Sequence, residues 1–386
     1  MSLFWFNGAI PKQGYLKRVL IVHPHGIGDV LWITPVIRAL SEYGVKRIDL
    51  LLGSRTREIF ERNPHANEMF EWDKSPVANI FKKWSRFKKL AVTFWKLWRN
   101  HYQVVLDFSL GSQYAFLCQF FFWIPVRLGF NFKGRGRFST HRLELPDGYT
   151  DKPVADYYLD LLNILNIQPT HKRTELFLDE RDFQNAEAIL KELGLHSGSS
   201  ILAIAPGGGE SWGSDARLKR WPVQYFVQLV KELHRDYGSL CEAIFILGGA
   251  AESQLAQQFL EAFPERSVYN LCGRVSIRTA AALIQKASLM LANDGGLVHV
   301  AHAIDTPVVA IYGPVDPKVY GPYPAKSAAL SLTASGPACR PCYQRFRYQA
   351  ACKGIECLTM LTPDRILARL HSERFLERLS SVGVSK

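Results

Sequence analysis

The chain of 386 residues is 47% hydrophobic and 21% charged. This globular balance excludes an intrinsically disordered protein, and the length suits two domains. The formal net charge is +12, and residues 1–170 carry most of the excess, with 23 Lys and Arg against 14 Asp and Glu. Asp107 is the only acidic residue between positions 74 and 143. Such a basic half indicates an acidic partner, which is nucleic acid, a phosphorylated substrate or an anionic membrane surface.

The sequence predicts neither a membrane span nor secretion. The longest mainly apolar run, residues 114–126, is too short to cross a bilayer. Residues 1–10 lack the basic region and the cleavage site of a signal peptide. We therefore expect a cytoplasmic protein. Cys118, Cys241 and Cys272 lie in apolar surroundings, which favours reduced, buried thiols.

The first half of the chain alternates strand-like and helical runs. Short β-branched runs predict buried strands, and an apolar period of three to four residues predicts a helix. The predicted strands are residues 18–23, 48–52 and 104–108, and the predicted helix is residues 35–43.

Residues 79–101 combine an apolar stripe at helical spacing with many basic residues. Phe94, Trp95 and Trp98 belong to the stripe. This pattern is typical of a basic amphipathic helix on an anionic bilayer. A core helix whose lysines face water would produce the same pattern. The basic residues that would contact the membrane are Lys82, Lys83, Arg86, Lys88 and Lys89.

After a polar stretch, the same alternation of strands and helices begins again. The predicted strands are residues 201–205, 243–247, 288–291 and 308–312, and the predicted helices are residues 223–235, 252–263, 277–286 and 363–379. Alternating elements predict an α/β protein with parallel sheets covered by helices. Because the pattern starts twice, we expect two domains, residues 1–170 and 171–365, and a closing helix in residues 366–386.

A glycine turn follows the first predicted strand, within His-Pro-His-Gly-Ile-Gly-Asp-Val-Leu at positions 23–31. It is not a G-x-G-x-x-G dinucleotide loop, because Leu31 stands where the third glycine is required. It also lacks the Gly-Lys-Ser/Thr of a phosphate-binding P-loop. The turn presents Asp29 at the carboxyl edge of a parallel sheet, where open α/β folds bind ligands. Asp29 is either a base for an incoming hydroxyl or the N-cap of the next helix.

A second glycine turn follows the predicted strand 201–205. Gly207 and Gly208 lie in this turn, and Lys219 begins a Lys-Arg-Trp-Pro step downstream. Glycines let backbone N–H groups approach an oxyanion closely, and a lysine adds a compact positive charge. Both features suit a diphosphate leaving group.

A third glycine turn lies in residues 291–299. Gly295 and Gly296 would open a helix whose N-terminal amides suit a phosphate. Asp294 can hold sugar hydroxyls. His299 on the first helical turn either faces the same site or is a satisfied core histidine.

Four cysteines fall close together near the C-terminus, with the spacing C-x2-C-x9-C-x4-C. This spacing allows a zinc or cluster site. Free thiols, or a disulfide formed after purification, would leave the same pattern. The four residues are Cys339, Cys342, Cys352 and Cys357.

Taken in this order, the motifs resemble those of glycosyltransferase family 9, the bacterial lipopolysaccharide heptosyltransferases. The resemblance runs from residue 18 to about residue 369. It rests on Gly-Ile-Gly-Asp-Val-Leu at 26–31, Lys-Arg-Trp-Pro at 219–222, Asn-Asp-Gly-Gly-Leu-Val-His at 293–299, Val-Ala-Ile-Tyr-Gly-Pro-Val-Asp-Pro at 309–317 and Cys-Arg-Pro-Cys at 339–342.

The resemblance implies a GT-B fold with two facing Rossmann-like domains, in which the acceptor binds the N-terminal domain and the donor the C-terminal one. It implies an ADP-heptose donor and a phosphorylated inner-core acceptor on lipid A. It further implies transfer with inversion at the anomeric carbon and without a metal or cofactor.

Residue roles follow from the same motifs. The resemblance implies that Asp29 is the general base and Lys219 binds the donor phosphates. It places Glu252 on the nucleoside and Asp294 on the donor sugar. The other expected donor-site residues are Gly207, Gly208, Gly295, Gly296 and His299. The expected acceptor-site residues are Gly28 and the basic residues Arg127, Lys133, Arg135 and Arg137.

The basic half then has a partner in a phosphorylated, lipid-linked saccharide at the inner face of the bacterial inner membrane. Nucleic acid is disfavoured, because the charges are interleaved with large apolar residues and no recognisable nucleic-acid module is present. A non-heptose transferase and a nucleotide-sugar epimerase of the same fold remain alternatives. Supplying donor alone and looking for an epimerised product separates the epimerase from a transferase.

Overall fold

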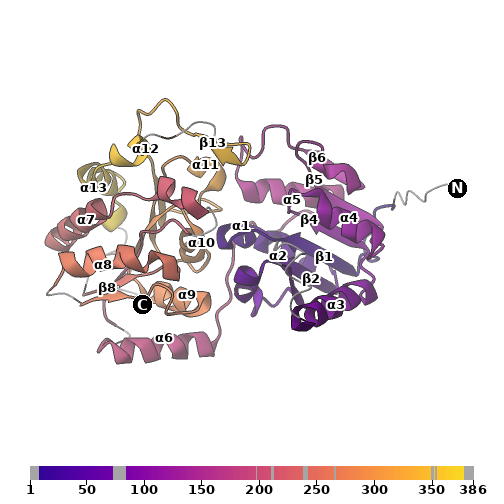
Figure 1. Ribbon diagram of the computed structural model, residues 1–386, viewed down its shortest axis with the longest axis horizontal. Coiled ribbons are helices and arrows are strands. Elements are labelled where there is room, and N and C mark those ends of the chain that lie inside the picture. The colour runs from indigo at the N-terminus through magenta and orange to yellow at the C-terminus, as the bar shows by residue number, and fades with distance from the viewer. Residues whose placement is uncertain are drawn as a thin grey trace. The chain divides into compact units, whose positions relative to one another are not determined.

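The structure is a computed structural model that describes residues 8–72, 84–196, 198–209, 213–237, 242–264, 267–348, 352 and 354–377. The chain folds into two compact units, which divide between Arg173 and Thr174. Figure 1 shows the N-terminal unit from indigo to magenta and the C-terminal unit from pink to yellow.

The N-terminal unit is a six-stranded parallel sheet in the order β3-β2-β1-β4-β5-β6. Its strands are β1 (Arg18–His23), β2 (Arg47–Leu52), β3 (Met69–Glu71), β4 (Val104–Asp107), β5 (Val126–Asn131) and β6 (His141–Glu144). Its helices are α1 (Ile27–Leu31), α2 (Thr34–Glu42), α3 (Trp84–Arg99), α4 (Ser112–Phe120) and α5 (Val154–Ile164), with 3-10 turns η1 (Ser54–Phe60) and η3 (Arg135–Phe138).

The C-terminal unit contains a second six-stranded parallel sheet, in the order β12-β11-β10-β7-β8-β9. Its strands are β7 (Ile201–Ala205), β8 (Ala243–Ile246), β9 (Ser267–Asn270), β10 (Leu289–Asn293), β11 (Val308–Ile311) and β12 (Ala329–Leu332). A separate antiparallel hairpin is formed by β13 (Tyr343–Gln344) and β14 (Arg347–Tyr348).

Helices of the C-terminal unit connect and cover these strands. They are α6 (Glu180–Glu192), α7 (Val223–Asp236), α8 (Ser253–Ala262), α9 (Ile277–Lys286), α10 (Gly296–Ala303), α11 (Pro317–Tyr320), α12 (Glu356–Thr359) and α13 (Pro363–Ser372), with 3-10 turns η4 (Gly213–Lys219) and η6 (Ala250–Glu252). None of the helices in the described part of the chain is long and apolar enough to cross a membrane.

Both sheets have the same topology. When the strands of each unit are numbered in chain order, each sheet reads 3-2-1-4-5-6, which is the doubly wound Rossmann order. The central strands β1 and β7 are almost completely buried because helices cover both faces of the sheet. The prediction of an α/β fold with two parallel sheets is therefore confirmed.

The sequence missed strands that lack a continuous apolar run. The edge strands β6 and β12 are half exposed along most of their length. In β5, Arg127, Gly129 and Asn131 interrupt the hydrophobic pattern. The apolar run 114–126 holds the greater part of α4 and the first residue of β5.

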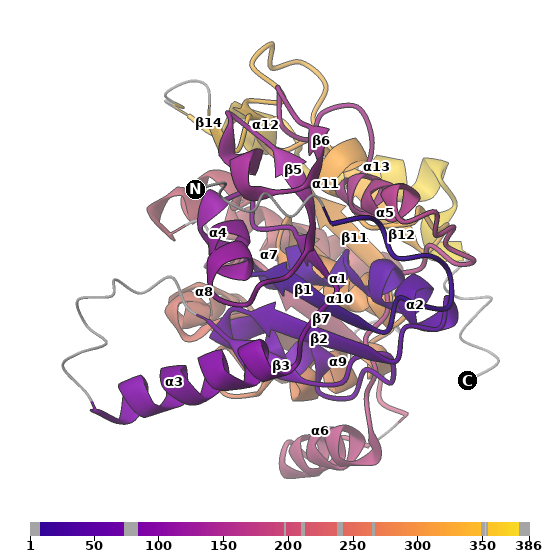
Figure 2. The ribbon, with the colours of Figure 1, turned by 90° about the vertical axis from the view of Figure 1, so that its right-hand side faces the viewer.

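Helix α3 presents two kinds of surface. Phe94 contacts Trp72 and Phe122 with ring centroids 5.4 and 5.1 Å apart, which packs α3 beside β3 (Figure 2). Trp95 and Trp98 instead remain 52% and 46% exposed. The predicted stripe is therefore divided between the core and the surface. Lys82 and Lys83 lie outside the described residues, as do the side chains of Arg86 and Lys89, whereas Lys88 is exposed.

The predicted closing helix belongs to the core of the C-terminal unit. Helix α13 contacts α7, and Ile366 and Leu370 are buried in the same core as strands β7, β8 and β10. The helix ends at Ser372, and residues 378–386 lie outside the described residues. Among the predicted buried thiols, Cys118 and Cys272 are buried and free, and Cys241 lies outside the described residues.

Candidate functional site

Three of the predicted site residues, Asp29, Gly207 and Asp294, follow strands at which the strand order of a sheet reverses. In the N-terminal sheet the reversal falls between β1 and β4, and in the C-terminal sheet between β7 and β10. Loops leave these neighbouring strands toward opposite faces, which opens a crevice at their carboxyl ends. Asp29 follows β1, Gly207 follows β7 and Asp294 follows β10.

Glycines allow the loops after β7 and β10 to meet backbone to backbone. A Cβ on Gly295 would lie 3.0 Å from the carbonyl carbon of Gly208, whose own φ of +76° is in the left-handed region. A Cβ on Gly207 would lie 1.7 Å from Oε1 of Glu252. A side chain at Gly207 or Gly295 would therefore push neighbouring groups apart.

A buried ion pair lies beside this contact. Nζ of Lys219, the last residue of η4, is 2.7 Å from Oδ2 of Asp294, and both side chains are buried. Removing either charge would leave the other buried without its partner, which is strongly unfavourable. The structure thus brings together the residue predicted to bind the donor phosphates and the one predicted to bind the donor sugar.

The Asn293 side chain connects two neighbouring backbone segments by hydrogen bonds. Its Nδ2 donates to the Pro206 carbonyl at 2.6 Å, and its Oδ1 accepts from the Trp221 N–H at 3.1 Å. Arg220 donates from Nε to the Gly207 carbonyl at 2.8 Å. These bonds connect the Lys-Arg-Trp-Pro step to the ends of β7 and β10. The sequence predicted the ion-pair residues but not Asn293, although this asparagine stands directly before Asp294.

Two tyrosines lie within electrostatic reach of Asp294. Burial, followed by the negative charge of Asp294, raises the pKa of the Tyr312 hydroxyl well above its ordinary value. The pKa of Tyr348 is raised for the same two leading reasons. Both hydroxyls therefore stay protonated and can donate hydrogen bonds. No sequence motif drew attention to either residue.

His299 on α10 is buried, and its environment keeps it neutral. Burial lowers the pKa of His299 to about 3, with smaller effects from His302 and the positive charge of Lys219. Burial likewise lowers the pKa of His302 to about 4. At neutral pH, His299 can offer one N–H donor to a ligand but no positive charge.

The Glu252 carboxylate joins two glycine loops. Its Oε1 accepts from the Gly209 N–H at 3.1 Å, and its Oε2 accepts from the Gly249 N–H at 2.9 Å. These bonds connect the loops after β7 and β8 beside the ion pair. Each carboxylate oxygen can accept a further hydrogen bond, and contact with the nucleoside stays a prediction.

Asp29 lies in the short helix α1 and is half-buried. Its Oδ2 accepts from the Gly26 N–H at 3.1 Å. Asp29 is therefore not the N-cap itself but the third helical residue, which bonds back to the turn. Gly28, a predicted acceptor-site residue, is the second residue of α1. The bond from Gly26 orients the carboxylate and does not exclude a role as a base.

Two histidines of the same turn are held by hydrogen bonds. Nε2 of the buried His23 is 3.1 Å from Oη of Tyr158, and Nε2 of His25 is 3.1 Å from the Ser109 carbonyl oxygen. The ring of His23 also stacks against Phe108. These contacts fix the turn that carries Asp29 against the end of β4.

Sequence reasoning missed two residues in this region. Asp107 ends β4 and accepts from the Ser109 N–H at 2.9 Å, and burial raises its pKa to about 6. The pKa of the buried Tyr149 hydroxyl is raised first by burial and also by the charge of Asp29. The sequence could have identified Asp107 as a candidate site residue, because it is an acidic residue at the carboxyl end of a predicted strand. Tyr149 had none.

The Arg127 side chain bonds backbone carbonyls of its own unit and is not exposed to bind an acceptor. Its Nε donates to the Phe138 carbonyl at 2.7 Å, and its Nη1 donates to the Ile124 carbonyl at 2.7 Å. The residue is only 7% exposed. Its basic character suggested a phosphate contact, but its donors instead hold backbone carbonyls that precede and follow β5.

The other predicted acceptor residues lie on an exposed basic loop. Lys133, Arg135 and Arg137 are all exposed. The Arg137 guanidinium lies 5.0 Å from the centroid of the Phe138 ring, which in turn lies 5.2 Å from the Phe116 ring. The basic loop is therefore continuous with the aromatic residues of α4.

Exposed apolar side chains lie on α3, on α4 and in the segment directly after α4. We call this set the aromatic patch, and the ring contact between Phe94 and Phe121, with centroids 6.2 Å apart, connects its two parts. Its members are Val92, Trp95, Trp98, Phe116, Phe120, Phe121 and Trp123.

Comparison with known proteins identifies the family. Residues 92–349 match the model of glycosyltransferase family 9 (heptosyltransferase). The chain belongs to this family. The match covers β4 through β14, which include the Lys219–Asp294 ion pair.

Relatives of this family 9 glycosyltransferase match almost its whole length. It is 25% identical over 365 residues to lipopolysaccharide heptosyltransferase 2 of Salmonella typhimurium, which covers 92% of this chain and 98% of that protein. The Escherichia coli K12 protein of the same name has the same identity and coverage.

Solved structures show the same fold. The E. coli ADP-heptose lipopolysaccharide heptosyltransferase II superimposes with a TM-score of 0.68 and 20% identity, over 94% of this chain and 99% of that chain. The family 9 glycosyltransferase of Veillonella parvula superimposes with a TM-score of 0.75 and 21% identity, over 94% and 98% of the two chains. The family 9 chain therefore has the GT-B fold.

The buried histidines of α10 predict a loss of stability in acid. Since the folded pKa of His299 is about 3, below the ordinary value of about 6.5, the unfolded state binds more protons between these pH values. The free energy of unfolding must then fall as the pH decreases below 6.5, by about 2 kcal/mol for one such histidine at pH 5. His299→Gln removes this contribution, so its free energy of unfolding should fall less than that of the wild type between pH 7 and pH 5.

Urea unfolding followed by tryptophan fluorescence at pH 5, 6 and 7 measures the difference. His196→Gln, which changes an exposed histidine of the same unit, is the control and should keep the wild-type slope. An equal slope for His299→Gln and wild type would contradict the assignment of a neutral His299.

Proposed function

We propose that this family 9 glycosyltransferase transfers a heptose from ADP-heptose to a hydroxyl of the phosphorylated inner core of lipopolysaccharide, with inversion at the anomeric carbon. Its relatives support the donor and the acceptor class, because they are lipopolysaccharide heptosyltransferases and one is an ADP-heptose enzyme. The observation that carries the proposal is the buried Lys219–Asp294 pair at the carboxyl edge of β7 and β10. A sugar diphosphate needs both a cation for its leaving group and an acceptor for its sugar hydroxyls.

On the donor side, Lys219 offsets the negative charge that develops on the departing ADP. Its ammonium carries three hydrogens, so it can bond Asp294 and a phosphate oxygen at the same time. The Asp294 carboxylate pairs with the buried lysine and accepts from donor sugar hydroxyls. Backbone amides from Gly295 and Gly296 at the start of α10 add partial positive charge, and neutral His299 donates a hydrogen bond.

On the acceptor side, Asp29 takes the proton of the attacking hydroxyl. As that oxygen bonds to the anomeric carbon, the bond from this carbon to the diphosphate breaks, and ADP leaves with the electron pair. The products are the heptosylated acceptor, ADP and a proton that Asp29 releases to solvent. The Gly26 N–H holds the carboxylate in one orientation, which lowers the entropic cost of the attack geometry.

The acceptor phosphates would bind the exposed loop of Lys133, Arg135 and Arg137, with Gly28 allowing close approach at α1. We omit Arg127, because its guanidinium holds backbone carbonyls.

We further propose that the aromatic patch rests on the anionic inner face of the inner membrane, where a lipid-linked acceptor lies. Trp123, 74% exposed, and Phe121, 51% exposed, belong to a surface whose neighbouring basic loop supplies the complementary charge. Aromatic side chains favour the headgroup region, and basic residues near it add attraction to anionic lipids.

Replacing Asp29 tests the base. Asp29→Asn preserves an oxygen that accepts from Gly26 but cannot take a proton, so kcat should fall by about 10²–10⁴-fold while ADP affinity is unchanged. Release of ADP from ADP-heptose in the presence of a truncated inner-core acceptor gives kcat. Asp156→Asn, which changes a half-buried aspartate of the same unit that pairs with Lys172, is the control. Near-normal kcat in Asp29→Asn would rule out the assigned role.

Replacing Lys219 tests the donor site. Lys219→Ala removes a charge-assisted hydrogen bond worth about 1.5–3 kcal/mol, so the Kd for ADP should rise by about 10- to 100-fold. Isothermal titration calorimetry with ADP measures the change, and UDP and GDP should bind more weakly than ADP to the wild type. Lys286→Ala removes a surface lysine paired with Glu187 and should bind ADP normally. An unchanged Kd in a folded Lys219→Ala variant would remove this lysine from the site.

Vesicle binding tests the membrane contact. Substituting Lys133, Arg135 and Arg137 together by Gln should weaken binding to anionic vesicles by about 100-fold, at about 1 kcal/mol for each charge. Phe120→Ser/Phe121→Ser/Trp123→Ser should also weaken binding, and Tyr15→Ser, which changes an exposed aromatic residue outside the patch, should not. Co-sedimentation at low and high salt gives the affinities. Equal binding by wild type and both triple variants would contradict the proposed surface.

A further inference from the structure

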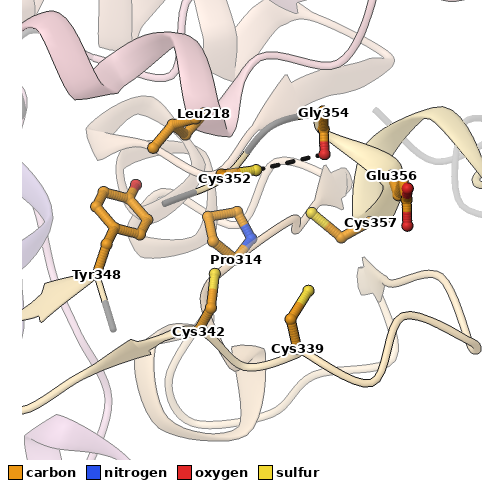
Figure 3. A pocket seen from close by; sticks show the side chains of 9 residues that line it. All are labelled: Leu218, Pro314, Cys339, Cys342, Tyr348, Cys352, Gly354, Glu356 and Cys357. Carbon is orange, nitrogen blue, oxygen red and sulfur yellow. Dashed lines mark hydrogen bonds between the residues drawn. The ribbon is translucent and has the colours of Figure 1, made fainter. Parts of the chain in front are cut away.

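The four C-terminal cysteines line one small cavity. Cys339, Cys342, Cys352 and Cys357 surround a space of about 30 Å³ together with Leu218 and Pro314. Figure 3 shows the four side chains around this space, with the sulfurs directed toward its interior. All four thiols are free. A cavity of this size can hold a small occupant, because about 10–15 Å³ measured in this way is enough for one water molecule.

The backbone holds the first two cysteines against the loop after β11. The Cys342 N–H donates to the Pro314 carbonyl at 3.1 Å. Arg340 donates from Nη1 to the Ala334 carbonyl and from Nη2 to the Val315 carbonyl, each at 3.2 Å. The Cys-Arg-Pro-Cys turn is therefore fixed at one wall of the cavity.

The hairpin and α12 bring the other two cysteines to the opposite wall. Strands β13 and β14 pair antiparallel, which reverses the chain after Cys342. Cys352 donates from Sγ to the Gly354 carbonyl at 3.3 Å. Cys357 is buried on α12, whose next residue, Leu358, packs into the core of the unit. Two pairs of thiols thus line one cavity from two separately anchored segments.

We propose that these four cysteines bind one thiophilic divalent metal ion, zinc or iron, in a closed four-thiolate site. Four thiolates in tetrahedral arrangement are the ligand set that both metals favour. Among the described residues, no three His, Cys, Asp or Glu side chains are arranged to hold a metal ion. Binding therefore requires rotation of the cysteine side chains toward the centre of the cavity they already line.

The site is structural. Four protein ligands leave no open coordination position for a substrate. The cavity is also lined by Leu218, which directly precedes Lys219, and by Tyr348, which interacts with Asp294. A bound ion would hold the hairpin and α12 against the segment that carries the Lys219–Asp294 pair.

Metal analysis of the full chain tests the proposal. The protein should be purified with a tag that has no histidine run, because such a run binds metal. Elemental mass spectrometry should then find about one zinc or iron ion per chain. Iron, once oxidised by air to the ferric state, would give thiolate-to-metal absorption in the visible range, and zinc would not. Cys342→Ser and Cys357→Ser should lose the metal. Cys272→Ser, which changes a buried thiol of the same unit outside the cavity, should retain it.

Two measurements on the wild-type protein keep the test valid even if the serine variants misfold. Titration with an organomercurial should release the metal in step with modification of cavity thiols, and the metal-depleted protein should take up one equivalent of added Zn²⁺. Three results would overturn the proposal: protein that neither contains metal nor takes up Zn²⁺, serine variants that retain the metal, or disulfides among the four cysteines found by peptide mapping. Because the readout is metal content, its failure is distinct from failure of heptose transfer.

Discussion

The contact between the ammonium of Lys219 and the carboxylate of Asp294 is the interaction on which the proposed donor site depends. Two opposite charges are buried together, and removing one of them would leave the other buried without a partner. The lysine ends a 3-10 turn after β7, and the aspartate follows β10. Pairing them therefore brings together two loops that are distant in the sequence and fixes where a negatively charged ligand can find a cation.

The surrounding backbone is arranged to make that pairing possible. Gly208 and Gly295 allow the two loops to touch, because neither carries a side chain that would separate them. Asn293 then satisfies the backbone groups of Pro206 and Trp221 that burial would otherwise leave unbonded. Glu252 does the same for Gly209 and Gly249. The charged residues of the ion pair and the residues that bond backbone groups thus alternate along the same edge of the sheet.

The N-terminal unit has the same strand order, but carboxylates rather than an ion pair lie where that order reverses, between β1 and β4. Its glycine turn carries a half-buried carboxylate, and its β4 ends in a buried one. The positive charge lies instead on exposed loops and helices beside exposed aromatic rings. This separation suits an acceptor whose reacting part is a neutral hydroxyl and whose remaining groups are anionic and attached to lipid.

The sequence by itself determined the fold class, most central strands and the motifs of the site, because buried parallel strands form continuous apolar runs and glycine turns follow them directly. Among the strands of the two parallel sheets it missed β3, β5, β6, β9 and β12, whose residues are interrupted by polar groups or lie at sheet edges. Only the tertiary structure decided which residues meet. Lys219 and Asp294 are far apart in the chain, so no local pattern could pair them, and Arg127 became a support for the backbone because the loop at Phe138 folds over it. Burial also decided the charge state of His299, since desolvation depends on neighbours that the local sequence does not contain.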